Sequence, residues 1–169
     1  SSAAVITNCI FSANIATILG GGINNNGSSP AITNCLFSGN LAAEGGAVDN
    51  QAASNATYIN CTFAANRATA GCGAITNQSS SNAIYRNSII WGNTGTSSNT
   101  ISNLSSSVPV VSNSLIEGGY AGGTAIITPN PLFINPQLSS AAPTSAGNYR
   151  LQNCSPAINA GDNSLIPGG

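Results

Sequence analysis

The stretch Ile6-Thr7-Asn8-Cys9-Ile10-Phe11 returns as Ile32-Thr33-Asn34-Cys35-Leu36-Phe37 and again as Tyr58-Ile59-Asn60-Cys61-Thr62-Phe63. Looser copies begin at Tyr85 and Val111. The asparagines of this motif stand at positions 8, 34, 60, 87 and 113, which are 26, 26, 27 and 26 residues apart. Spacing this regular indicates an internal structural repeat.

Two further sets of positions recur in phase with the motif. One consists of asparagines three residues after the aromatic or aliphatic position: Asn14, Asn40, Asn66 and Asn93. The other is apolar and follows a glycine-rich stretch in the first three repeats: Ile23, Val48, Ile75, Ile101 and Ile127. Short β-branched and aromatic stretches separated by Gly, Asn and Ser predict short strands, and no segment has a sustained helical period.

A period near 26 residues built from short strands predicts an all-β fold, a right-handed parallel β-helix, or solenoid, of about five coils. Successive coils would lie about 4.8 Å apart and place equivalent side chains in columns. One inward column is expected to contain Ile6, Ile32, Tyr58 and Tyr85, and another Phe11, Phe37, Phe63, Ile90 and Ile116.

The motif asparagines Asn8, Asn34, Asn60, Asn87 and Asn113 are expected to occupy a corner of the coil. Asparagine tolerates the left-handed backbone conformation that a sharp corner requires. Its side-chain amide can also bond the asparagine above and below it, as in stacked amide ladders. We therefore predict a structural ladder along this column.

The chain has five cysteines, and three of them, Cys9, Cys35 and Cys61, fall in one column. Stacked positions have parallel Cα–Cβ vectors, whereas a disulfide needs the two sulfur atoms to converge. We expect a column of buried free thiols that fill space as small apolar groups. No His or acidic residue joins this column, so no metal site is expected there.

The chain has 169 residues with only 3 Lys+Arg, 4 Asp+Glu and no His, so 4% of its residues are charged. An ordinary soluble domain has roughly 25%. Three cations cannot form the basic stripe of a nucleic-acid interface, and imidazole-dependent catalytic triads are excluded. The apolar runs are too short for a membrane span, and no cofactor is expected.

The four acids are Glu44, Asp49, Glu117 and Asp162. Glycoside hydrolysis needs two carboxylates that flank the scissile bond. No two acids stack on adjacent coils, and only Glu44 and Asp49 share one coil, where a catalytic pair is conceivable. We expect all four to be solvated turn residues, and the chain not to be an enzyme.

From Pro129 onward prolines interrupt the repeat. We therefore predict β-helix coils over residues 1–128 and a Pro-rich capping segment over 129–169, packed on the last coil within one domain. Leu132, Phe133, Leu151 and Ile158 are expected to cover that coil.

Three motifs in the capping segment carry a family resemblance: Asn130-Pro131-Leu132-Phe133, Asn148-Tyr149-Arg150-Leu151-Gln152, and Ser155-Pro156-Ala157-Ile158-Asn159-Ala160-Gly161-Asp162. This tail resembles the end of secreted bacterial β-helix proteins of the choice-of-anchor Q type. The coils are also similar to the repeats of chlamydial polymorphic outer-membrane proteins. The resemblance implies a secreted or cell-surface location within a larger surface protein, and it implies no enzyme activity.

We therefore expect a non-catalytic extracellular or cell-surface module with a structural or adhesive role. One alternative is a surface-fibre subunit that stacks end to end with itself or with neighbouring domains, because strands begin close to Ala4 and leave an unpaired edge. Another is a polysaccharide-binding or polysaccharide-degrading protein. For glycan binding Trp91 is the candidate ligand contact, because an indole can stack on a sugar ring.

Overall fold

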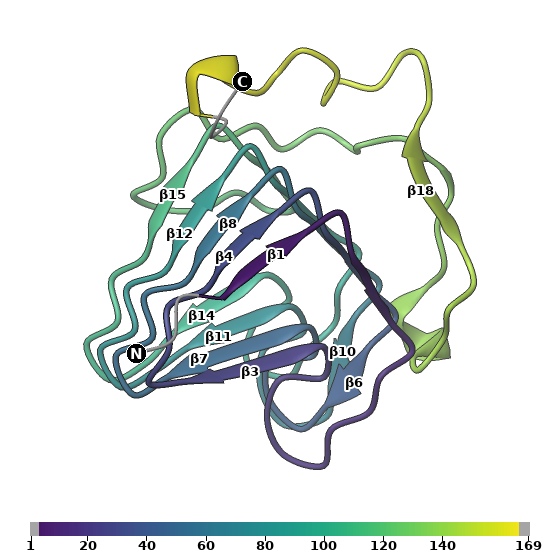
Figure 1. The fold of residues 1–169 in the computed structure, drawn as a ribbon. Helices are drawn as coiled ribbons and strands as arrows, with labels where there is room; N and C mark the ends of the chain where they lie inside the picture. Colours follow the sequence, from purple (N-terminus) through teal and green to yellow (C-terminus); the bar gives the residue numbers. More distant parts are fainter. Residues whose placement is uncertain (1–3, 166–169) are drawn as a thin grey trace.

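The computed structural model describes residues 4–165, which wind into a parallel β-solenoid. Strands of successive coils pair in parallel, so three walls surround one apolar core (Figure 1). The fold class predicted from the 26-residue repeat is confirmed.

Each wall is one parallel sheet, named here in the order in which a coil passes through it. The first sheet contains β1 (Val5–Thr7), β4 (Ala31–Thr33), β8 (Thr57–Ile59), β12 (Ile84–Arg86) and β15 (Val110–Ser112). The second contains β2 (Ile10–Ser12), β5 (Leu36–Ser38), β9 (Thr62–Ala64), β13 (Ile89–Trp91) and β16 (Leu115–Ile116). The third contains β3 (Ile23–Asn26), β7 (Val48–Gln51), β11 (Ile75–Asn77) and β14 (Ile101–Asn103).

The other elements lie at a corner and in the tail. A short parallel pair, β6 (Leu41–Ala42) and β10 (Arg67–Ala68), follows the second sheet. The tail forms an antiparallel pair, β17 (Phe133–Asn135) and β18 (Asn148–Leu151), and two 3-10 helices, η1 (Ser139–Ala141) and η2 (Asn163–Leu165).

The solenoid has about four complete coils and not the five that we expected, because the fifth leaves the pattern after β16. Gly118, Gly119 and Gly122 adopt positive φ and reverse the chain within a few residues. Thr124 then pairs with Ser112, and Ile127 with Leu115, so Ile127 does not continue the third sheet beyond Ile101 as its spacing predicted. Residues 117–128, called the cap segment below, thus cover the ends of the first and second sheets.

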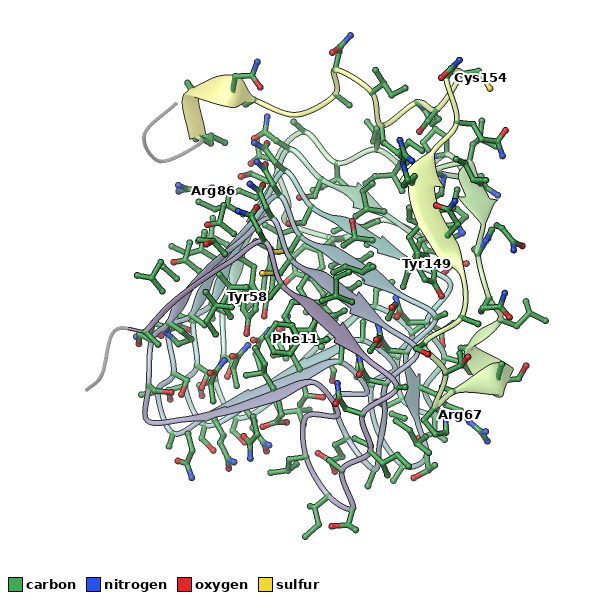
Figure 2. All side chains as sticks on the ribbon, turned by 45° about the vertical axis from the view of Figure 1, so that its right-hand side comes forward. Phe11, Tyr58, Arg67, Arg86, Tyr149 and Cys154 are labelled. Atoms are coloured by element: carbon green, nitrogen blue, oxygen red, sulfur yellow. The ribbon has the colours of Figure 1, made fainter. Side chains whose placement is uncertain are left out.

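The two predicted inward columns form the core. Their members are Ile6, Ile32, Tyr58, Tyr85 and Val111 in the first sheet, and Phe11, Phe37, Phe63, Ile90 and Ile116 in the second. The rings of Phe11 and Phe37 stack with centroids 4.7 Å apart, those of Phe37 and Phe63 4.9 Å apart, and those of Tyr58 and Tyr85 5.0 Å apart. These distances match the spacing of paired strands, about 4.8 Å. Figure 2 shows Phe11 and Tyr58 inside the walls.

The motif asparagines occupy the corner between the first and second sheets. Asn8, Asn34, Asn60, Asn87 and Asn113 all have positive φ, between 50° and 55°. Within residues 4–165, no hydrogen bond joins the side chains of neighbouring members of this column, in contrast to the expected amide ladder. The left-handed corner directs these amides outward, where they line surface cavities instead of meeting each other.

Amide ladders run along two other asparagine columns. In one, the Nδ2 groups of Asn14, Asn40 and Asn66 each donate to Oδ1 of the asparagine one coil later, over 2.9 Å, and the column ends at Asn93. In the other, those of Asn25, Asn50 and Asn77 donate over 2.7–3.0 Å, and the column ends at Asn103. Asn66 also donates to Phe37 O and receives the main-chain N–H of Asn40. These bonds satisfy amides that are fully buried.

The tail lies along the side of the solenoid and is not confined to the last coil, where we expected it. Thr144 N donates to Gly39 O in the second coil over 2.9 Å, and the Ser139 and Thr94 hydroxyls lie 2.6 Å apart. Asn87 bonds Asp162 farther along the tail. In Figure 1 the tail, with β18, follows the right-hand wall and returns over the top. The cap segment covers the end of the rod, so the tail is left to pack against a wall.

We expect Asn66→Ala to lower the free energy of unfolding by roughly 3 kcal/mol or more, because several buried partners lose their hydrogen bonds at once. Asn14→Ala is the matched control, since Asn14 belongs to the same ladder but is exposed. It should cost less than about 1 kcal/mol. Urea unfolding followed by circular dichroism measures both, and equal losses would contradict the ladder's contribution.

Candidate functional site

A groove runs between the corner asparagines and the tail. It consists of two cavities of about 280 and 400 Å³ that share Asn60 and Thr62. On the solenoid side it is lined by the corner column from Asn34 to Asn113 and by outward residues of the second sheet; on the other side it is lined by parts of residues 147–163. We call it the tail groove.

The corner amides give the groove its hydrogen-bonding capacity. Asn87 shows how such an amide binds a polar chain: its Nδ2 donates to Asp162 O over 2.8 Å, and its Oδ1 accepts from Asp162 N over 2.9 Å. Asn60 and Asn113 stand one coil before and after Asn87, and no side-chain hydrogen bond engages them within the described chain. Each offers the same donor and acceptor pair to a ligand.

Apolar and aromatic groups complete the walls. Ile89 and Leu115 of the second sheet face Leu151 across the larger part of the corner. Tyr149 lies on the solenoid side of β18 (Figure 2), and its ring packs edge-on against Phe133 at 5.5 Å. Burial raises the pKa of Tyr149, and its hydroxyl has no hydrogen-bond partner in residues 4–165. Apolar walls with a few convergent polar groups are typical of ligand sites.

Three of the four acids bond to nearby main chain or side chains, and none lines the groove except through the backbone of Asp162. Glu117 Oε2 accepts from Gly92 N over 2.8 Å, and Asp162 Oδ1 accepts from Ser164 N over 2.9 Å. Asp49 is fully buried, and Gln78 Nε2 donates to both of its oxygens over 3.1 Å. The expectation that all four are solvated is therefore wrong for Asp49.

The burial of Asp49 comes from its neighbours on the outer side of the third sheet. Its strand, β7, alternates, with Val48 and Asn50 directed into the core and Asp49 directed away from it. Gln78 reaches back from the next coil and covers it. Burial raises the pKa of Asp49 to about 6, and the like charge of Glu44 adds to this shift. Thr76 lies beside Asp49 in the sheet and keeps a buried hydroxyl without a partner in the described chain.

The cysteine column is buried except at its first member. Cys35 and Cys61 lie in the core cluster, whereas Cys9 is exposed, in contrast to our expectation, because no coil covers it in the described chain. Burial raises the pKa of Cys35, and that of Cys61 to about 12. Ser88 and Ser114 continue the column with small hydroxyls that accept main-chain N–H groups over 3.1–3.2 Å.

The aromatic candidates separate into core and surface. Tyr58 and Tyr85 are fully buried, and their hydroxyls donate to Asn50 and Asn77 of the third-sheet ladder. Trp91 is half-buried at the end of β13, beside Ala64 on the outer side of the second sheet. It does not line the tail groove, where Tyr149 is the aromatic residue.

Sequence reasoning missed the groove and the ladder of Asn25, Asn50, Asn77 and Asn103. The ladder had a readable signal, since each member follows the recurrent apolar position by two residues. The groove had none, because one of its walls is the non-repeating tail. Within residues 4–165 no three His, Cys, Asp or Glu side chains gather as metal ligands, and no helix is long and apolar enough to cross a membrane.

The Asp49 carboxyl predicts that stability falls as the pH rises from about 4 to 6. Its pKa is raised in the folded protein, so in this window the folded state holds a proton that the unfolded state has released. The loss amounts to roughly 3 kcal/mol and is complete above the folded-state pKa. Asp49→Asn should lack this decline in urea unfolding at pH 4 and pH 7, and an unchanged decline would refute the assignment.

Thiol labelling should distinguish two classes of cysteine. Cys9 and Cys154 are exposed and should react with a maleimide in the native protein, whereas Cys35, Cys61 and Cys72 are buried and should be protected. Mass spectrometry after brief labelling should therefore find two adducts in the native protein and five after unfolding. Equal labelling rates for all five would be inconsistent with the buried column.

The chain was compared with protein families, curated proteins and solved structures. No family model matches it, and neither does any curated protein. No solved structure matches it either. The parallel β-solenoid is therefore established by the structure itself, and the resemblance of the tail to the choice-of-anchor Q type stays a prediction.

Proposed function

We propose that this chain is a non-catalytic module of an extracellular or cell-surface protein, with a structural and adhesive role. The tail groove is the adhesive site, and its ligand is an uncharged glycan segment. The observation that carries this proposal is the composition of the groove: it combines unengaged corner amides with aliphatic and aromatic walls, and Arg150 is the only charged residue among its described lining.

Neutral hydroxyl-rich ligands fit such a surface. Each corner amide offers one acceptor and two donors without charge, which suits sugar hydroxyls. Asn60 and Asn113 are two coils apart, and Tyr149 adds a ring beside them. An aromatic face packs against the C–H groups of a sugar ring.

The surface location and the family assignment rest on the tail motifs. Asn148-Tyr149-Arg150-Leu151-Gln152 and its neighbours resemble secreted proteins of the choice-of-anchor Q type. The low charge and the self-stacking coils favour a rigid spacer that presents a binding face away from its attachment. We propose this role for the chain on both grounds.

The alternatives have less support. A polysaccharide-degrading site would need two carboxylates that face a substrate. Glu44 and Asp49 share a coil, but Asp49 is buried under Gln78 and away from the groove. End-to-end stacking of copies would need free strand edges at both ends, and the cap segment pairs with β15 and β16 at one of them.

The test is binding to a panel of uncharged oligosaccharides, including glucose, xylose and mannose oligomers, measured on an array and by calorimetry. The double variant Asn60→Gly with Asn113→Gly removes two amides from the groove and keeps the positive φ, which glycine adopts readily. We expect at least tenfold weaker binding, since two hydrogen bonds of about 1 kcal/mol each are lost.

Asn8→Gly is the matched control, because Asn8 occupies the same corner with φ 55° but lies outside the groove. It should bind as the unaltered chain does. Equal weakening by the control, or no binding to any uncharged oligosaccharide, would disprove the proposed site.

A further inference from the structure

The first coil is open on one side. β1, β2 and β3 are each the outermost strand of their sheets, so one edge of every strand lacks a neighbour in the described chain. Apolar side chains of this coil are strongly exposed, with Ile10 at 70%, and Ile15 and Ile18 at 66%. Phe11 stacks on Phe37 with one face, and Figure 2 shows it in the first coil. Unpaired strand edges of this kind are templates for further pairing.

Both asparagine ladders have the same polarity along the rod. In each, Nδ2 of the earlier coil donates to Oδ1 of the later coil, as from Asn14 to Asn40 and from Asn25 to Asn50. The first coil therefore presents Asn14 Oδ1 and Asn25 Oδ1 as acceptors, and no described residue donates to either. Any group that continues the ladders there must bring two N–H donors.

The opposite end of the rod is closed. Asn103 Nδ2, the last donor of the third-sheet ladder, bonds the Tyr120 hydroxyl of the cap segment over 2.8 Å. Thr124 and Ile127 occupy the edges of β15 and β16. A second copy thus has no open far end with which to continue the first coil of this one.

We infer that the open face of the first coil binds one further coil of the same repeat, supplied by a partner polypeptide whose solenoid ends uncapped. The incoming coil pairs in parallel with β1, β2 and β3, as each coil already does with the next one. Its two ladder asparagines donate to Asn14 Oδ1 and Asn25 Oδ1. This repeats the interface between coils that is already present within the chain, and it is independent of the tail groove.

The probe is a labelled peptide that copies residues 31–56, the second coil, with Cys35→Ser to prevent disulfide formation. Serine suits this column, as Ser88 and Ser114 show. Fluorescence anisotropy with the full chain measures binding, and hydrogen exchange locates it. Binding should slow exchange of the main-chain amides of β1 and β2.

The control peptide carries Asn40→Asp and Asn50→Asp, which keep the side-chain size but remove the N–H donors. It should bind at least about tenfold more weakly, as should the original peptide to an Asn14→Ala chain, because buried hydrogen bonds are lost. Absence of binding, or equal binding of the two peptides, would overturn the inference. So would sedimentation velocity showing that the chain pairs with itself through this face and excludes the peptide.

Discussion

Inside this solenoid each side chain packs against its own counterpart one coil away. Every inward position must therefore be occupied by a group that stacks on itself. Phenylalanine and tyrosine do so ring on ring at 4.7–5.0 Å, and asparagine does so by donating Nδ2 to the next Oδ1. Charged side chains repel their own copies at this spacing. This explains why only 4% of the residues are charged, and why Arg86 stands in register with Ile59 and Ser112 and not with another cation.

The outward positions follow a different rule, since the surface they form is set by what lies beside it. The corner asparagines would be ordinary solvated turn residues if the tail did not return along the second sheet. The bidentate bond between Asn87 and Asp162 joins the tail to this corner and leaves the equivalent amides of Asn60 and Asn113 directed into the groove. The candidate site is thus a product of one repeating wall and one segment that does not repeat.

The same division explains what could be predicted from the sequence. Translation by 26 residues determines the neighbours of Phe37, Tyr58 and Cys61 before any coordinates exist, so the sheets and both core columns were predictable. The contacts of the tail, such as Thr144 with Gly39, join residues that no period relates. The early end of the fifth coil depends on three glycines with positive φ, which the apolar spacing of Ile127 conceals. The burial of Asp49 depends on Gln78 from another coil, which a strand pattern alone does not reveal.

The length of the corner between the first two sheets does not vary. Six residues separate the corner asparagine from the ladder asparagine in all four complete coils, whereas 11, 10, 11 and 10 residues lead from there to the third-sheet asparagine. The left-handed corner and the ladder after it hold that short stretch at both ends. Differences in chain length are absorbed in the glycine-rich bend, where the backbone makes no inward column. Loops inserted at that bend would project from the rod at intervals of one coil, so this edge is where the architecture can diversify without changing its interior.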